Sequence, residues 1–120
     1  MAELFYTPGH EWIRFEDDKA FVGLTGVGLE GDVVYIELPD IGRRVEKGDA
    51  CASVETVKTV RDVHAPVAGV VIAVNDAVFD DPDVITRQPL DSWLLKLNVY
   101  DHDRGGLLTE RQYAALTQTD

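Results

Sequence analysis

The sequence has little cysteine. Its 120 residues contain one, Cys51, so the chain can form no internal disulfide and no zinc site that needs several thiolates. We expect Cys51 to lie buried in a strand as a small apolar side chain, and a reactive resolving thiol is the alternative.

Positive charge is also scarce. Lysine and arginine number 11 against 22 aspartates and glutamates, which gives a net charge of −11 at pH 7. A polyphosphate would be repelled over most of such a surface, so nucleic acid is excluded as a partner and an anionic membrane surface is disfavoured. The acidity favours rapid encounter with basic patches on partner proteins.

Long apolar runs are missing as well. No stretch reaches the roughly 18 apolar residues that a membrane-spanning helix requires, and the N-terminal residues show no signal peptide. We therefore expect a cytoplasmic protein. With 45% hydrophobic residues, residues 1–120 are expected to form one domain.

Short β-type runs separated by glycines and prolines make up most of the chain. They are rich in β-branched and aromatic residues, which favour strands. The expected strands are residues 19–24, 32–38, 50–57, 69–74 and 93–99. Their regular spacing, with turn residues between them, is typical of a sandwich or a barrel.

Helix signals are few and concentrate at the C-terminus. Thr109 can cap a helix with Gln112 at its third position, and Leu108 can pack against Tyr113. Weaker patterns suggest one helical turn near residues 27–30, among glycines that disfavour it, and another near 80–85.

One of the few lysines has an unusual setting. Lys58 stands between Val57 and Thr59 where two strands need a tight turn, with Glu55 before it and Asp62 after it. A lysine at a hairpin tip is solvated and protonated, so a group attached to its amine would extend into solvent from a stiff base. On the residues alone, a surface lysine near two carboxylates is the simpler interpretation.

Four segments, in order and at nearly matching spacing, resemble the motifs of one protein family. The sequence is similar to the H protein of the glycine cleavage system, a lipoyl carrier, from about Leu4 to Leu116. The matching segments are YTPGHEW at 6–12, GDVVYIELP at 31–39, VETVK at 54–58 and DVHAPVAG at 62–69.

The resemblance implies the cofactor and its attachment site. The lysine of the third motif, here Lys58, carries lipoate in amide linkage in that family, and acylation removes its charge. Glu55, Asp62, Gly42 and Gly69 match positions that help the lipoate-attaching enzyme to recognise the hairpin. For Gly69 a purely structural role is an equal alternative.

The resemblance also implies the fold and the partners. We expect a mostly β barrel-sandwich hybrid of the lipoyl/biotinyl kind, with two small antiparallel sheets and short helices, one of them C-terminal. Lys58 would lie at a hairpin turn of this single carrier domain. The monomeric carrier would have no catalytic residues and would take an aminomethyl group from a decarboxylase to an aminomethyltransferase. Dihydrolipoyl dehydrogenase would then reoxidise it.

Three segments depart from the family pattern. Residues 25–30 form a segment two residues shorter, with two glycines, and residues 89–93 are one residue shorter and lack a glycine. The small residues that usually follow the lysine are replaced by Thr59, Val60 and Arg61. All three changes fall where partners or a loaded arm would make contact.

These departures favour one group of lipoate-binding proteins that are similar to H proteins. The chain resembles the H-like lipoate-binding proteins that accompany heterodisulfide-reductase-like complexes in sulfur-oxidising prokaryotes, where the lipoyl sulfurs carry or oxidise sulfur species. We therefore expect a lipoyl carrier for sulfur oxidation, with such a complex as its partner. The alternatives are the classical glycine cleavage H protein and a regulatory relative without lipoate.

No metal site is expected. The three histidines, His10, His64 and His102, are scattered through the sequence and show no ligand spacing. The sequence likewise has no nucleophile elbow.

Overall fold

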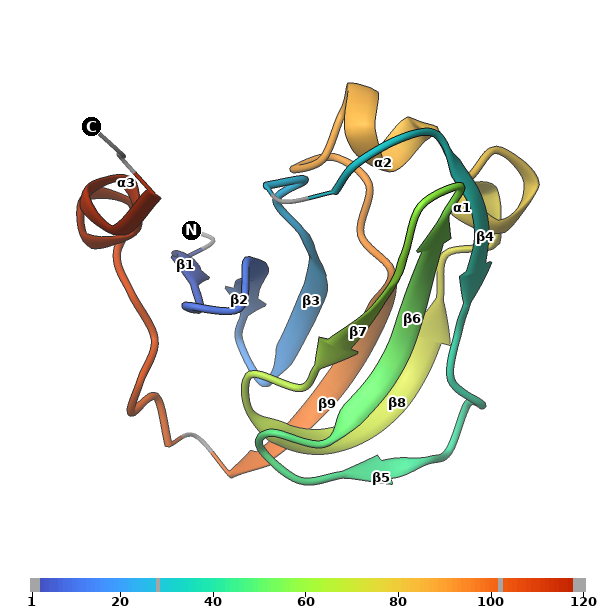
Figure 1. Cartoon of the computed structure of the whole chain (residues 1–120). Helices are drawn as coiled ribbons and strands as arrows, with labels where there is room; N and C mark the ends of the chain where they lie inside the picture. Colours follow the sequence, from blue (N-terminus) through green and yellow to red (C-terminus); the bar gives the residue numbers. More distant parts are fainter. Residues whose placement is uncertain (1–2, 28, 102, 118–120) are drawn as a thin grey trace.

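The computed structural model describes residues 3–27, 29–101 and 103–117 (Figure 1). Most of this part of the chain is β-strand, and the helices are short. The strands are β1 Glu3–Tyr6, β2 Glu11–Glu16, β3 Lys19–Leu24, β4 Val33–Glu37, β5 Arg44–Val45, β6 Ala50–Thr56, β7 Val60–His64, β8 Ala68–Val74 and β9 Leu95–Asp101; the helices are α1 Asp76–Asp80, α2 Val84–Arg87 and α3 Glu110–Thr117.

The strands form two antiparallel sheets. One is a six-stranded sheet in the order β1-β2-β3-β9-β8-β5, and the other is three-stranded in the order β4-β6-β7. The smaller sheet packs across the larger one (Figure 1). The expected mostly β fold with two antiparallel sheets is confirmed. One sheet is larger than expected, because β1 and β2 extend it, and the strands do not close into a barrel.

The core lies between the two sheets. Side chains alternate along each strand, so one face of each sheet is buried against the other. Val54, Ile36 and Val63 of the small sheet are fully buried, as are Val22 and Leu97 of the large one. This packing fixes the direction of β6 and β7 relative to the rest of the molecule.

The five predicted strands are confirmed as β3, β4, β6, β8 and β9, with ends that differ by at most two residues. Strands β1, β2, β5 and β7 were not predicted. In β7, Arg61, Asp62 and His64 are polar, which weakened the apolar pattern. These strands exist because a neighbouring strand supplies their hydrogen bonds, which is a tertiary effect.

The C-terminal helix starts as the sequence predicts. The Thr109 hydroxyl accepts a hydrogen bond from the Gln112 amide at 3.2 Å, and the Gln112 side chain accepts one from the Thr109 amide at 2.9 Å. This reciprocal pair is a capping box. Buried Tyr113 then stacks on Tyr6, with ring centroids 4.6 Å apart, and holds α3 against β1.

The other helical predictions have mixed outcomes. Helix α2 follows from the turn expected near residues 80–85. Helix α1 was missed, although the Asn75 side chain caps it by accepting from the Ala77 amide at 3.2 Å. The turn expected near residues 27–30 is not helical at Leu29 and Glu30, and Gly28 lies outside the described residues.

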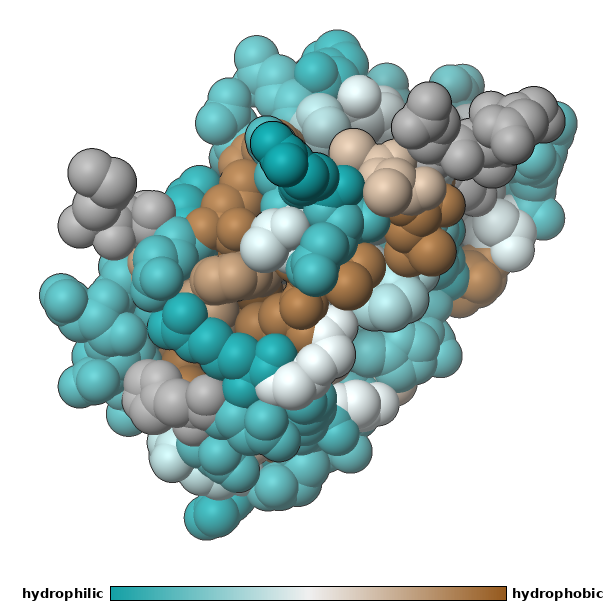
Figure 2. Space-filling view, turned by 90° about the vertical axis from the view of Figure 1, so that its left-hand side faces the viewer, coloured by the Kyte–Doolittle hydropathy of each residue, from teal (hydrophilic) through white to brown (hydrophobic). Residues whose placement is uncertain are grey.

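The described helices are too short and too polar to cross a membrane. On the face seen from the side of α3, apolar side chains gather near the centre and polar ones surround them (Figure 2). Leu4 and Leu108 are partly buried against the cluster formed by Tyr6, Trp12 and Tyr113.

Candidate functional site

Lys58 lies at the turn of the β6–β7 hairpin. Strand β6 ends at Thr56 and β7 begins at Val60, so the lysine stands at the end of the small sheet (Figure 1). Its side chain is exposed. The ion pairs found within the described ranges do not include its amine. The amine is therefore open to solvent at a structurally defined bend.

A buried hydroxyl holds this turn. The Thr56 Oγ1 atom accepts hydrogen bonds from the amides of Lys58 and Thr59, both at 3.1 Å. The Thr56 amide also donates to the Thr59 carbonyl at 2.8 Å, and Thr56 is only 4% exposed. Sequence reasoning missed Thr56, although a threonine ahead of a tight turn is a known signal for such side-chain bonds.

The loop between β3 and β4 supports the turn from one side. The Val57 amide donates to the Asp32 carbonyl at 3.0 Å. Gly31 has a φ of +81°, and a Cβ there would lie 2.6 Å from Val57 Cγ2 and 3.5 Å from Lys58 Cγ. Only glycine suits this backbone and this close approach. The loop therefore lies close to the stem of Lys58.

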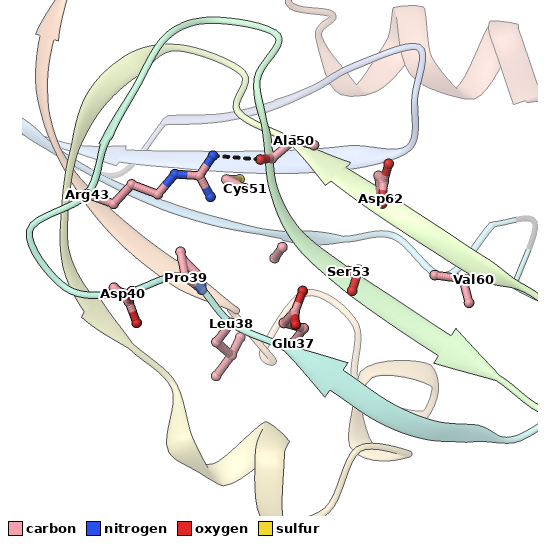
Figure 3. A pocket seen from close by; sticks show the side chains of 11 residues that line it. Glu37, Leu38, Pro39, Asp40, Arg43, Ala50, Cys51, Ser53, Val60 and Asp62 are labelled. Carbon is pink, nitrogen blue, oxygen red and sulfur yellow. Dashed lines mark hydrogen bonds between the residues drawn. The ribbon is translucent and has the colours of Figure 1, made fainter.

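Glu55 and Asp62 lie on the outer face of the small sheet. Glu55 pairs with Val60 in the register of the hairpin, and Asp62 pairs with Ser53. Ser53 is also opposite Glu37, so Glu37, Ser53 and Asp62 form a row across three strands. This row lines a groove of about 420 Å³ (Figure 3). The face beside Lys58 is thus acidic.

Arg43 lies at the far end of this groove and donates to the Ala50 carbonyl at 2.9 Å (Figure 3). Cys51 also lines the groove but is 3% exposed, and its thiol donates to the Val63 carbonyl at 3.4 Å. Burial raises the pKa of the Cys51 thiol to about 11. A thiol that stays protonated is a poor nucleophile, so Cys51 is the buried strand residue that we expected.

The two candidate glycines do not lie at the turn with Lys58. Gly42 has a φ of +97° in the turn after β4, and its amide donates to the Val71 carbonyl at 2.7 Å. Gly69 lies near the start of β8, where a Cβ would be 2.7 Å from the Asn98 carbonyl oxygen. Gly42 lies between β4 and β5, Gly69 lies in β8, and the turn that bears Lys58 joins β6 to β7. Backbone geometry is a sufficient reason for glycine at each position.

Arg61 joins the hairpin to two other loops. Its guanidinium donates to the Val27 carbonyl and to the Gly9 carbonyl, each at 3.0 Å. The first carbonyl belongs to the loop between β3 and β4, and the second to the loop between β1 and β2. Sequence reasoning noted Arg61 only as a departure from a family pattern, because its partners are distant in the sequence.

The histidines take part in hydrogen bonds. His10 Nδ1 lies 2.7 Å from the Tyr113 hydroxyl, and that hydroxyl also lies 2.7 Å from Thr25 Oγ1. His64 Nδ1 lies 3.3 Å from the buried Glu11 carboxylate. His102 lies outside the described residues. Across the part of the chain that the structure describes, no group of three or more potential ligands could hold a metal.

Comparison with known proteins gives one consistent result. Residues 4–120 match the family model described as "Glycine cleavage H-protein". A glycine cleavage system H protein from Listeria innocua is 44% identical over 115 residues, which cover 92% of each chain. One from an Enterobacter species is 42% identical over 124 residues, which cover 99% of this chain and 96% of that one.

A solved structure agrees with the sequence matches. The crystal structure of a glycine cleavage system H protein from Mycobacterium marinum superposes with a TM-score of 0.86 at 38% identity. The match covers 94% of both chains. This chain therefore shares its fold with a solved structure of a glycine cleavage system H protein.

Removing the Thr56 hydroxyl should loosen the turn. We expect Thr56→Val to lower the free energy of unfolding by about 1–2 kcal/mol, because two amides at the turn lose their acceptor. The Lys58 and Thr59 amides should also exchange faster with solvent. Thr56→Ser retains the hydroxyl and is the control in urea unfolding and amide exchange. Equal stability and exchange in both variants would show that the hydroxyl does not hold the turn.

Titration of His10 should make stability depend on pH. Burial lowers the pKa of His10, and the nearby Arg61 charge lowers it further, while Glu11 opposes this. Below pH ~6.5 the unfolded chain therefore binds more protons at this residue than the folded chain does, so the free energy of unfolding falls as the pH falls.

The measurement is urea unfolding at pH about 7.5 and about 5.5. His10→Asn is the comparison, because asparagine tolerates the φ of 71° at this position and does not titrate. We expect the wild type to lose more stability than this variant between the two pH values. Equal losses would assign the pH dependence to other groups.

Proposed function

The chain belongs to the glycine cleavage H-protein family, and on this premise we propose that it carries lipoate on Lys58 and serves glycine cleavage. Proteins of this family are carriers, so the chain is a carrier component and not an enzyme. The observation that supports Lys58 is its exposed amine at a turn that is held by a buried hydroxyl.

The residues present fit a covalently attached arm. Acylation needs an accessible amine, and the Lys58 side chain is exposed. The Lys58 stem lies beside Gly31, so the arm starts from a supported position. When bound, the dithiolane supplies a disulfide that partner enzymes reduce, load and reoxidise. The single, buried Cys51 is consistent with thiol chemistry supplied by a cofactor.

We also propose that Glu55 and Asp62 belong to the surface that a lipoate-attaching enzyme recognises. Both are exposed on the outer face of the hairpin that presents Lys58. Gly42 and Gly69 would contribute indirectly, by keeping the turn after β4 and the start of β8 in shape.

Glycine cleavage is the better-supported system. The matched relatives are named as glycine cleavage H proteins, and nothing in the comparisons supports sulfur oxidation. Two of the departures that suggested sulfur oxidation contact each other in the fold, because Arg61 donates to the Val27 carbonyl in the segment between β3 and β4. These two changes therefore have a place in the framework of the protein.

The proposed partners follow from this system. They are the lipoate-attaching enzyme, the decarboxylase, the aminomethyltransferase and dihydrolipoyl dehydrogenase. An acidic carrier with a net charge of −11 would meet basic patches on these enzymes quickly. We propose that one copy of the chain acts as one carrier domain in the cytoplasm.

The attachment site is tested by intact mass after expression with a lipoylating enzyme. We expect one lipoyl adduct on the wild type and none on Lys58→Arg, because arginine offers no amine for amide formation. Lys47→Arg is the matched control, since Lys47 also lies in a turn, and it should keep the adduct. An adduct on Lys58→Arg would reject the site. A wild type that stays unmodified would favour a regulatory relative without lipoate.

The pathway is tested separately with the lipoylated protein. Reconstituted glycine–bicarbonate exchange should proceed when this chain is the only carrier, and Lys58→Arg should abolish it. A carrier that is fully lipoylated yet supports no exchange would contradict a role in glycine cleavage and would favour a role in sulfur oxidation.

A further inference from the structure

Arg61 occupies an unusual position beside the hairpin turn. It lies on β7, three residues after Lys58, and it pairs with buried Val54 in the register. Its side chain is half-buried and points toward the loops of the large sheet, where it reaches the Val27 and Gly9 carbonyls at 3.0 Å each. Two nitrogens of one rigid guanidinium thus bind two separate loops.

The first of these loops is the support of the turn. It runs from Thr25 to Asp32, and its last residues contact Val57 and Lys58. At the other end Thr25 is anchored, because its amide donates to the His10 carbonyl at 2.9 Å and its hydroxyl meets Tyr113. Arg61 binds this loop between the two anchored ends.

The second loop is connected to the same anchor. Gly9 precedes His10, whose side chain bonds to the Tyr113 hydroxyl on α3. Arg61 is therefore part of a hydrogen-bond network that connects the hairpin, through both loops, to the C-terminal helix. Arg61 and the β3–β4 loop form one unit, because the guanidinium reaches the Val27 carbonyl at 3.0 Å.

We propose that Arg61 is a positioning residue that holds the β3–β4 loop against the hairpin and so sets the direction in which the Lys58 side chain leaves the turn. The inference rests on the proposed attachment of lipoate to Lys58. A planar guanidinium can bind two carbonyls at once, whereas lysine is a point donor and a small residue binds neither. Ordering the turn before an enzyme binds lowers the entropy cost of binding.

The test compares Arg61→Ser, Arg61→Lys and the control Arg44→Ser. Arg44 is an exposed arginine on β5 with an ion pair to Glu46, so its loss removes the same charge far from the turn. Amide exchange is measured for residues 25–27, 29–32 and 56–59, with the β8–β9 ladder as reference. Lipoylation kinetics with a purified lipoate-attaching enzyme give KM and kcat.

We expect Arg61→Ser to speed exchange in the loop and the turn by about tenfold and to leave the β8–β9 ladder unchanged. The KM for lipoylation should rise several-fold with kcat near the wild-type value, because the ordered surface is lost and the amine is not. Arg61→Lys should recover part of both effects by binding one carbonyl, and Arg44→Ser should show neither.

Three outcomes would overturn the inference. Exchange that is unchanged in the loop would mean that Arg61 does not hold it. Exchange that rises equally in every strand would assign Arg61 to general stability. A variant with a loosened loop and a wild-type KM for lipoylation would show that the loop does not influence how Lys58 is presented to the enzyme. If the wild type takes up no lipoate, the proposed function fails, and the exchange data still decide whether Arg61 holds the loop.

Discussion

The presentation of Lys58 depends on hydrogen bonds to the backbone of one tight turn. Thr56 binds the turn from inside the small sheet, and the Asp32 carbonyl binds it at Val57 from the neighbouring loop. Because the small sheet packs its inner face on the large one, the strands that lead into the turn cannot pivot. Motion is therefore left to the side chain, which is the arrangement that a carrier of a flexible arm requires.

The charges of the molecule suit brief encounters. Glu37, Glu55 and Asp62 face solvent on the outer side of the small sheet, and the ion pairs among the described residues do not engage them. Exposed charges of one sign raise association rates more than they slow dissociation. A carrier that visits several enzymes in turn needs rapid binding to each and rapid release from each.

Local signals were readable from the sequence, and contacts between distant segments were not. The capping box at Thr109, the strand that ends at Thr56 and the turn at Lys58 each depend on a few consecutive residues. Thr56 itself could have been found, since its turn signal is local. Strand β5 and the partners of Arg61 depend on segments that meet only in the folded chain, so no periodic pattern in the sequence predicts them.

The departures from the family pattern show the same limit. Their meaning for function depends on contacts between distant segments, which the sequence does not reveal. Read one at a time, a short loop and a bulky cation beside the lysine suggested an arm that carries or oxidises sulfur species. In the folded chain the cation is directed at two backbone carbonyls, and one of them belongs to the short loop. A guanidinium whose donors already bind carbonyls is poorly placed to contact a partner or a loaded arm. Because Arg61 and the loop contact each other in the fold, both departures are evidence about the framework before they are evidence about the substrate.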